Sequence, residues 1–167
     1  MRIVDKSEVE SWLSKRGLLS PERKISIPKT FSFRSFPIPV DTGMKRFLSK
    51  TITNLYYAVG GEALLWISEY GIWPSAENLN LFYGFRKSLG EDASLYDEPG
   101  HLFAKEDLSA IDSLLCLTLY FFWGCMVAPP SCDFLICVSH DEMVDVFVRN
   151  GIEGNRKVTR AIEDAVK

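Results

Sequence analysis

The chain of 167 residues has two histidines, and both stand close to carboxylates. The segment Ser139-His140-Asp141-Glu142 follows an apolar run, and His101 ends an acidic stretch rich in turn residues. An imidazole beside carboxylates can act as a general acid or base, or bind a divalent metal. The first candidate site therefore contains His140, Asp141 and Glu142, with His101 if the fold brings the histidines together. The alternative is that these are solvated turn residues, because Ser and Asp accept hydrogen bonds within turns.

The sequence predicts neither a metal site nor a reactive thiol. The histidines lack the His-x-His and His-Glu-x-x-His spacings of metal sites, so no metal and no cofactor is expected. Six residues separate Cys125 from Cys132, and four separate Cys132 from Cys137, which misses the Cys-x-x-Cys pattern of zinc sites. A nucleophilic thiol also needs an electropositive setting, whereas these cysteines lie in an apolar stretch with acidic neighbours. We expect them to pack as small apolar side chains.

A second candidate site follows another apolar segment and consists of Glu69, Trp73 and Glu77. Carboxylates beside an indole can line a pocket for a cation or a sugar, or contact Arg and Lys of a partner protein. The structural alternative is that Trp73 covers the end of the core. Glu77 would then lie in the first turn of a helix, where a negative charge is favourable.

Charge is distributed unevenly along the chain, although the net charge is only −3. Residues 1–50 hold eleven basic and five acidic residues, residues 51–147 hold three and fourteen, and residues 148–167 hold five and three. Because complementary charge speeds association and adds specificity, the acidic middle segment predicts a basic protein partner. The expected contact residues are Glu69, Trp73, Glu77, Glu91, Asp92, Asp97 and Glu98.

Nucleic acid and membrane are not expected as partners. No Gly-x-Gly-x-x-Gly or Walker-type loop is present. A single-stranded nucleic acid could stack on the aromatic residues near Arg34, which are Phe31, Phe33 and Phe36. The acidic middle segment would repel its phosphate backbone, however, unless the fold separates the acidic segment from the basic one. Residues 113–132 are uncharged, yet the continuously helix-like part, 114–128, is short beside the roughly 20 residues that span a bilayer.

Residues 106–148 organise the predicted fold. Apolar residues recur at three- and four-residue steps from Leu108 to Met126, which predicts one long buried helix that ends around Gly124 and the prolines at 129 and 130. Residues 134–138 are apolar on both faces, as in a central strand, and residues 143–148 alternate, as in a half-exposed strand. With four residues between them, the two strands should form an antiparallel hairpin.

The remaining elements complete an α+β fold. We predict a single domain over residues 1–167, with a mixed or antiparallel sheet of about four to six strands, helices packed on it and a C-terminal β-hairpin. The charged residues 1–16 contain no apolar signal region, which predicts a cytoplasmic protein. The other elements expected are a helix over 5–16 capped by Ser7 and Glu10, edge strands within 23–34, a helix over 41–59 capped by Asp41, a strand over 63–68, a helix over 75–89, a loop over 91–101 and a last helix from 151.

The leading functional prediction is a small bacterial-type interaction protein whose acidic middle segment binds a basic partner. An inhibitor or immunity protein of a toxin is one concrete form. Since no complete catalytic constellation is visible, the sequence favours a binding protein over an enzyme. The alternative is a hydrolase-like enzyme or metal-binding protein that uses the turn at His140, Asp141 and Glu142.

Overall fold

The computed structural model of the chain describes residues 1–22, 24–58, 61–70, 79–151 and 155–167. Within them, seven strands and five α-helices form an α+β fold, which confirms the predicted class and exceeds the expected strand number. In chain order the elements are β1 (Arg2–Val4), α1 (Lys6–Ser14), β2 (Phe31–Pro37), α2 (Thr42–Tyr57), β3 (Ala63–Glu69), α3 (Leu79–Ser88), β4 (Gly100–Phe103), the short 3-10 helix η2 (Lys105–Asp107), α4 (Leu108–Phe121), β5 (Gly124–Ala128), β6 (Phe134–Val138), β7 (Met143–Arg149) and α5 (Asn155–Ala165).

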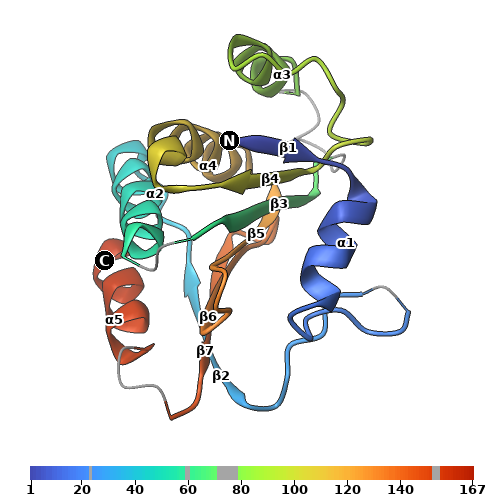
Figure 1. Cartoon of the computed structure of the whole chain (residues 1–167). Coiled ribbons are helices and arrows are strands. Elements are labelled where there is room, and N and C mark those ends of the chain that lie inside the picture. The colour runs from blue at the N-terminus through green and yellow to red at the C-terminus, as the bar shows by residue number, and fades with distance from the viewer. Residues whose placement is uncertain (23, 59–60, 71–78, 152–154) are drawn as a thin grey trace.

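The seven strands form one sheet in the order β1-β4-β3-β5-β6-β7-β2. Every neighbouring pair is antiparallel. Helices α2, α4 and α5 cover one face of the sheet, α1 covers the other, and α3 lies near the end formed by β1 and β4 (Figure 1). The sheet therefore has β1 at one edge and β2 at the other.

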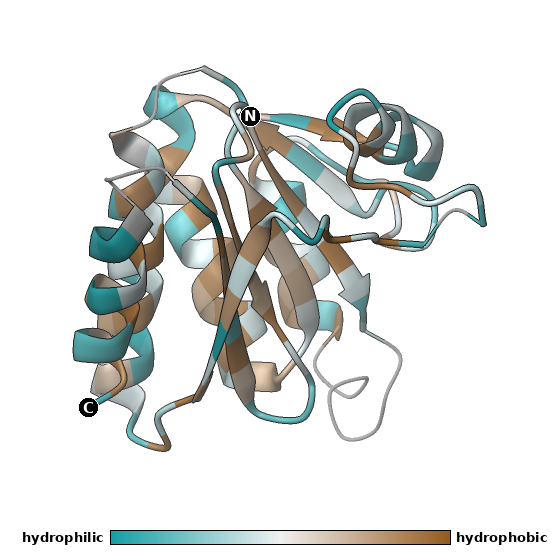
Figure 2. Ribbon diagram, turned by 90° about the horizontal axis from the view of Figure 1, so that it is seen from below, coloured by the Kyte–Doolittle hydropathy of each residue, from teal (hydrophilic) through white to brown (hydrophobic). Residues whose placement is uncertain are grey.

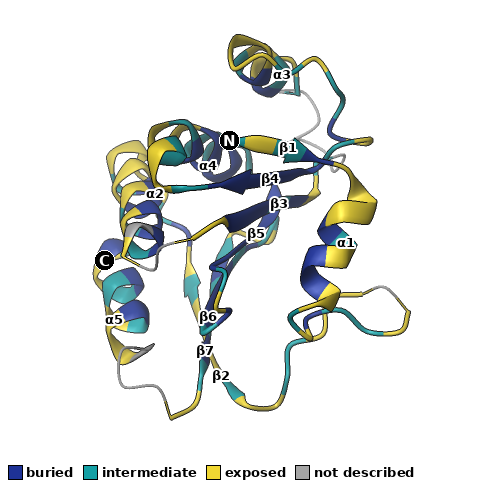
Figure 3. Cartoon of the chain, viewed as in Figure 1, coloured by how far each residue is buried: buried dark blue, intermediate teal, exposed yellow. Residues whose placement is uncertain are grey.

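Both faces of the central strands are buried, and this produces two cores. The larger core lies beneath α2, α4 and α5 and takes in Val144, Val146 and Val148 of β7. The smaller core lies beneath α1 and takes in Trp12 and Leu135. Hydrophobic residues accordingly concentrate on the central strands (Figure 2), which are buried, whereas β2 is mostly exposed (Figure 3). Apolar residues on both faces of β3 and β6 thus reflect burial on both faces.

The prediction of one helix as far as Met126 is wrong. Helix α4 has 14 residues and ends at Phe121, and the next residue, Phe122, adopts a left-handed conformation with φ 52°. The backbone N–H of Trp123 donates to the carbonyl of Thr118 and closes the helix. The next five residues form β5, in the middle of the sheet. Periodicity cannot separate a short buried strand from a buried helix. Within the described residues, no helix combines the length and apolarity needed to cross a bilayer.

The helix starts are set by aspartates. Asp41 caps α2 as predicted, because its carboxylate accepts from the backbone N–H of Met44 at 2.9 Å. Helix α1 lies within the predicted range 5–16, but its cap is Asp5 and not Ser7, and the Asp5 carboxylate accepts from the backbone N–H of Glu8 at 2.8 Å. The capped helices direct their apolar sides onto opposite faces of the sheet.

The strands agree with the sequence in part. The hairpin of β6 and β7 is confirmed, and β2 lies at a sheet edge as expected. The three-residue β1 was not predicted. Strand β4 occupies the end of the predicted loop over 91–101, so the loop is shorter than expected and ends at Pro99.

Gly100 of β4 permits α1 and β1 to pack closely against the sheet. A Cβ at this position would lie 2.3 Å from a methyl carbon of Val9 and 2.6 Å from one of Val4. We expect Gly100→Ala to lower the free energy of unfolding by about 1–3 kcal/mol, because the backbone or the valines must move. Chemical denaturation measures this change.

Gly84 of α3 provides the matched control, since a Cβ there would meet no atom within 4 Å. Gly84→Ala should stabilise the protein by up to about 1 kcal/mol through helix propensity. Equal unfolding midpoints for the Gly100→Ala variant and the unmodified protein would contradict the packing argument.

Candidate functional site

The turn between β6 and β7 holds His140 in a fixed place. The backbone N–H of Ser139 donates to the carbonyl of Met143 at 2.9 Å, and that of Glu142 donates to the carbonyl of Ser139 at 3.2 Å. The Ser139 hydroxyl accepts from the backbone N–H of Asp141 at 3.0 Å. Glu142 takes the left-handed conformation that such a turn requires, with φ 62°. The turn thus projects the imidazole at one end of the sheet.

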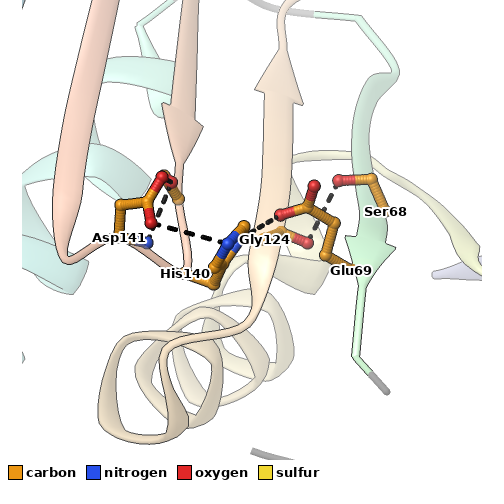
Figure 4. A network of polar contacts seen from close by, with 6 residues as sticks. Ser68, Glu69, Gly124, His140 and Asp141 are labelled. Carbon is orange, nitrogen blue, oxygen red and sulfur yellow. Dashed lines mark hydrogen bonds and ion pairs between the residues drawn. The ribbon is translucent and has the colours of Figure 1, made fainter. Parts of the chain in front are cut away.

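Glu69 from the end of β3 reaches this imidazole. Its Oε2 lies 2.7 Å from Nδ1 of His140 (Figure 4). A register shift between Ile67 and Glu69 places Glu69 opposite Gly124 of β5. A Cβ on Gly124 would stand 2.5 Å from the same carboxylate oxygen, so only glycine leaves room for Glu69 there. Residues from the two sites predicted separately therefore form one hydrogen-bonded pair.

The second predicted site is otherwise not assembled in the described residues. Glu69 belongs with His140, and Trp73 and Glu77 lie outside the residues that the structure describes. The predicted grouping of these three residues stays a prediction.

Two carboxylates favour the protonated form of His140. The hydrogen bond that the Glu69 carboxylate accepts from the protonated ring raises the pKa of His140, and the Asp141 carboxylate, 3.5 Å from Nε2, adds to the effect. The side chains of His140 and Glu69 are 36% and 44% exposed, so the pair is open to solvent. With both ring nitrogens facing carboxylates, the imidazole is suited to hold or donate a proton and not to accept one.

Glu142 does not join this pair. Its carboxylate acts on Lys45 of α2, where it opposes the lowering of the Lys45 pKa by burial. The Lys45 ammonium lies 4.0 Å from the ring centroid of Phe122. Among the described residues, no group of three or more His, Cys, Asp and Glu side chains is arranged to hold a metal ion. The predicted set of His140, Asp141 and Glu142 is therefore only partly brought together.

His101 is buried within β4, so the prediction of a loop histidine is wrong. Its Nδ1 lies 3.3 Å from the carbonyl oxygen of Leu65, and its ring meets Phe82 edge-on at 6.0 Å. Burial, with the nearby Arg86 cation, lowers the pKa of His101 to about 3. This histidine is neutral in the interior, whereas His140 is on an exposed turn. The two histidines do not form a common site.

Arg86 of α3 is fully buried, which the sequence analysis missed. Its Nη2 donates to the carbonyl of Glu98 at 3.1 Å. Burial lowers the pKa of Arg86, and the carboxylates of Glu91 and Glu98 oppose this shift. The spacing of four residues from the buried Phe82 was the available signal, because positions i and i+4 share a helix face. Arg86 thereby supports the segment that follows α3.

That segment, residues 91–98, is here called the acidic loop, and it is anchored at several points. Leu95 is buried in the larger core, and its backbone N–H lies 3.4 Å from the Tyr83 hydroxyl oxygen, which accepts. The Ser94 hydroxyl donates to the Asp97 carboxylate at 2.6 Å. Tyr96 stands between these anchors and is 81% exposed. The loop therefore presents an aromatic ring from an ordered backbone.

The four predicted contact residues of the acidic loop differ in exposure. Asp92 and Asp97 are exposed, and Glu91 and Glu98 are partly buried. Burial and the neighbouring Glu91 carboxylate raise the pKa of Glu98. Asp92 also forms an ion pair of 3.2 Å with Lys87 at the end of α3. The exposed aspartates are the members best placed to meet a partner.

The four cysteines are free and buried or partly buried, as predicted for packing residues. Burial raises the pKa of Cys125 to about 12 and that of Cys132 to about 11. Burial likewise raises the pKa of Cys116 and of Cys137. The thiols stay protonated near neutral pH and are poor nucleophiles.

The pair of Glu69 and His140 can be tested by titration. Because the chain has two histidines with opposite pKa shifts, their imidazole signals separate in an NMR titration. We expect His140 to titrate above 6.5 and Glu69→Gln to lower its pKa. Asp141→Asn should lower it less, since that carboxylate is farther away and 77% exposed. A pKa of His140 that is identical in the Glu69→Gln variant and the unmodified protein would exclude the pair.

His101 should make folding sensitive to acid. Below pH 6.5 the unfolded chain binds a proton at this residue, whereas the folded protein keeps it neutral down to about pH 3. Its contribution to stability is therefore lost as pH falls, by about 1.4 kcal/mol per pH unit and about 2 kcal/mol by about pH 5. Urea denaturation at several pH values should show a smaller loss for His101→Gln. Parallel stability curves for the two proteins would contradict the burial of a neutral imidazole.

Comparison of the chain with models of protein families, with curated proteins and with solved structures finds no match.

Proposed function

We propose that this protein binds a basic protein partner through the acidic loop. The observation that supports this most is the exposure of Tyr96, at 81%, between Asp92 and Asp97. Tyrosines are frequent anchors of protein interfaces, because a rigid ring supplies a large contact area at a small entropic cost. The surrounding carboxylates select a partner with Arg or Lys around the pocket that receives the ring.

The anchoring of the loop favours binding. Leu95 is held in the core, Ser94 bonds Asp97, and the Glu98 carbonyl accepts from Arg86. A loop ordered in the free protein loses little conformational freedom on association, which leaves more of the contact energy for affinity. The buried side chains of this region thus support the exposed ones.

Repulsion among the carboxylates gives a cationic partner a further advantage. The pKa of Glu98 is raised by burial and by Glu91, with smaller effects from Asp5 and Asp97. A guanidinium or ammonium placed among these groups would relieve that repulsion. Inhibition of a basic enzyme, as by the immunity protein of a nuclease toxin, is one form of this function that matches the charge.

The pair of Glu69 and His140 supports a second candidate function, a hydrolase-like reaction. In it, His140 would act as the proton donor, since its pKa is raised and its side chain is accessible. The attacking nucleophile would be water or a substrate group, because the raised pKa values of the four cysteines keep them protonated. This candidate ranks second because the pair offers a proton donor without a complete catalytic constellation.

Binding by the acidic loop can be tested with the partner itself. The protein is immobilised, partners are captured from the source cell at low salt, and a stoichiometric basic protein is identified and purified. We expect Tyr96→Ala to raise the Kd about 30-fold, which corresponds to a loss of about 2 kcal/mol. The pair Asp92→Asn and Asp97→Asn should slow association and reduce its dependence on salt.

The control removes the same charge from exposed acids outside the loop, through Glu22→Gln together with Glu106→Gln. This variant should bind as the unmodified protein does. Equal affinity of the Tyr96→Ala and aspartate variants, or capture of no basic protein, would contradict the proposal.

A further inference from the structure

A groove of about 870 Å³ lies between α5 and the edge strand β2. Its lining includes five cationic and two acidic side chains. We call it the basic groove. Its cations come from both ends of the chain and are Arg34, Arg149, Arg156, Arg160 and Lys167.

The order of strands explains how these distant residues meet. Strand β2 pairs with β7 at the sheet edge, where Ser32 lies opposite Val148 and Arg34 opposite Val146. Val158 and Ile162 of α5 are buried in the larger core with the valines of β7. Helix α5 therefore covers β7, and the face of β2 beside it remains open. The two basic segments of the sequence are joined in this way at one edge of the sheet.

Positive charge is in excess within the groove. Each of its carboxylates pairs with a cation four residues away, Glu163 with Lys167 at 2.9 Å and Asp164 with Arg160 at 3.8 Å. Arg34 has a smaller electrostatic effect on Glu163. Arg34 and Arg156 form no ion pair with any residue in the part of the chain that the structure describes. Guanidinium groups bind phosphate through two parallel hydrogen bonds, which suits these two arginines to an anionic ligand.

An exposed aromatic side chain lines the groove from the other face of the same edge strand, because Phe33 is opposite Phe147 and Arg34 is opposite Val146. Phe33 is 55% exposed, and its ring centroid lies 4.9 Å from that of Phe147. The Arg149 guanidinium lies 5.4 Å from the ring centroid of Phe31. Arginines that follow a backbone, together with an aromatic ring on which a base can stack, are the features of proteins that bind single strands.

The fold also removes the electrostatic objection to a phosphate ligand. The acidic loop leads into β4, which pairs with the edge strand β1, whereas the groove borders β2 at the opposite edge. Five strands lie between β1 and β2, so the two charged regions are at opposite ends of the sheet (Figure 1). Repulsion across such a distance is largely screened at physiological salt.

From this arrangement we propose that the basic groove binds a single-stranded nucleic acid. Arg34 and Arg156 contact successive phosphates on the α5 side of the edge strand, and Phe33 stacks on a base where the nucleic acid passes the outer edge of β2. Recognition of this kind depends on the backbone and on stacking and is tolerant of sequence. The basic groove is at the end of the molecule opposite the acidic loop, so nucleic acid bound there leaves the loop free for the partner proposed above.

Fluorescence anisotropy with labelled oligo-dT and oligo-U of about ten nucleotides tests the groove in the full chain, over about 50 to 200 mM salt. Binding should weaken with salt. We expect Arg34→Glu with Arg156→Glu to lower affinity by on the order of 10-fold or more, and to flatten the plot of log K against log salt by roughly 1.4, or about 0.7 per phosphate contact. Phe33→Ala should lower affinity roughly 5-fold or more with an unchanged slope.

The matched control is Lys6→Glu with Lys157→Glu, which changes the net charge equally at exposed residues outside the groove. Lys157 is the neighbour of Arg156 in α5, so the comparison separates the groove from general charge. Circular dichroism confirms that each variant is folded. Absence of oligonucleotide binding at low salt, or equal effects of the control, would overturn the proposal. Equally tight binding of tripolyphosphate or of a poly-glutamate peptide would also overturn it.

Discussion

The backbone of β5 must find hydrogen-bond partners on both sides, because all five of its residues are buried. Pairing with β3 on one side and β6 on the other satisfies this need and fixes the middle of the sheet. The same pairing ends α4 before a left-handed Phe122 and places Gly124 against β3. Glu69 then lies over Gly124 and can reach His140. The exposed pair at the end of the sheet is thus a consequence of its buried centre.

Local patterns were sufficient for the parts of the fold that local forces decide. Asp41 is followed by an amphipathic helix, and in β7 valines alternate with other residues, so the valine face must be the buried one. Both elements were therefore predicted with the correct buried sides. Strand β5 was not, since its five apolar residues continue the pattern of α4 without a break. The three residues of β1 are too few to show any period. In these places tertiary pairing, and not local preference, determines the structure.

The candidate site shows the same division. His140, Asp141 and Glu69 were each selected by residue type, but the contact of Glu69 with His140 spans 71 positions and depends on a register shift in β3. His101 was assigned to solvent because of its acidic neighbours, whereas its place in β4 is set by pairing with β3. The burial of Arg86 was not predicted, because buried arginines are rare and the partner of this one is a backbone carbonyl, which the sequence does not identify. The chemical character of each residue could be judged from the sequence, but the contacts between residues far apart in the chain could not.

The sheet has two open edges, and both are built in ways that oppose its extension. Strand β1 has only three residues, and β2 has a proline at its end and a charged Arg34 in its middle. Short, charged or proline-containing edge strands are poor templates for the addition of another chain. A protein with an antiparallel sheet buried on both faces would otherwise risk growth into fibrils. The two edge strands therefore prevent further strands from being added to the sheet by other copies of the protein.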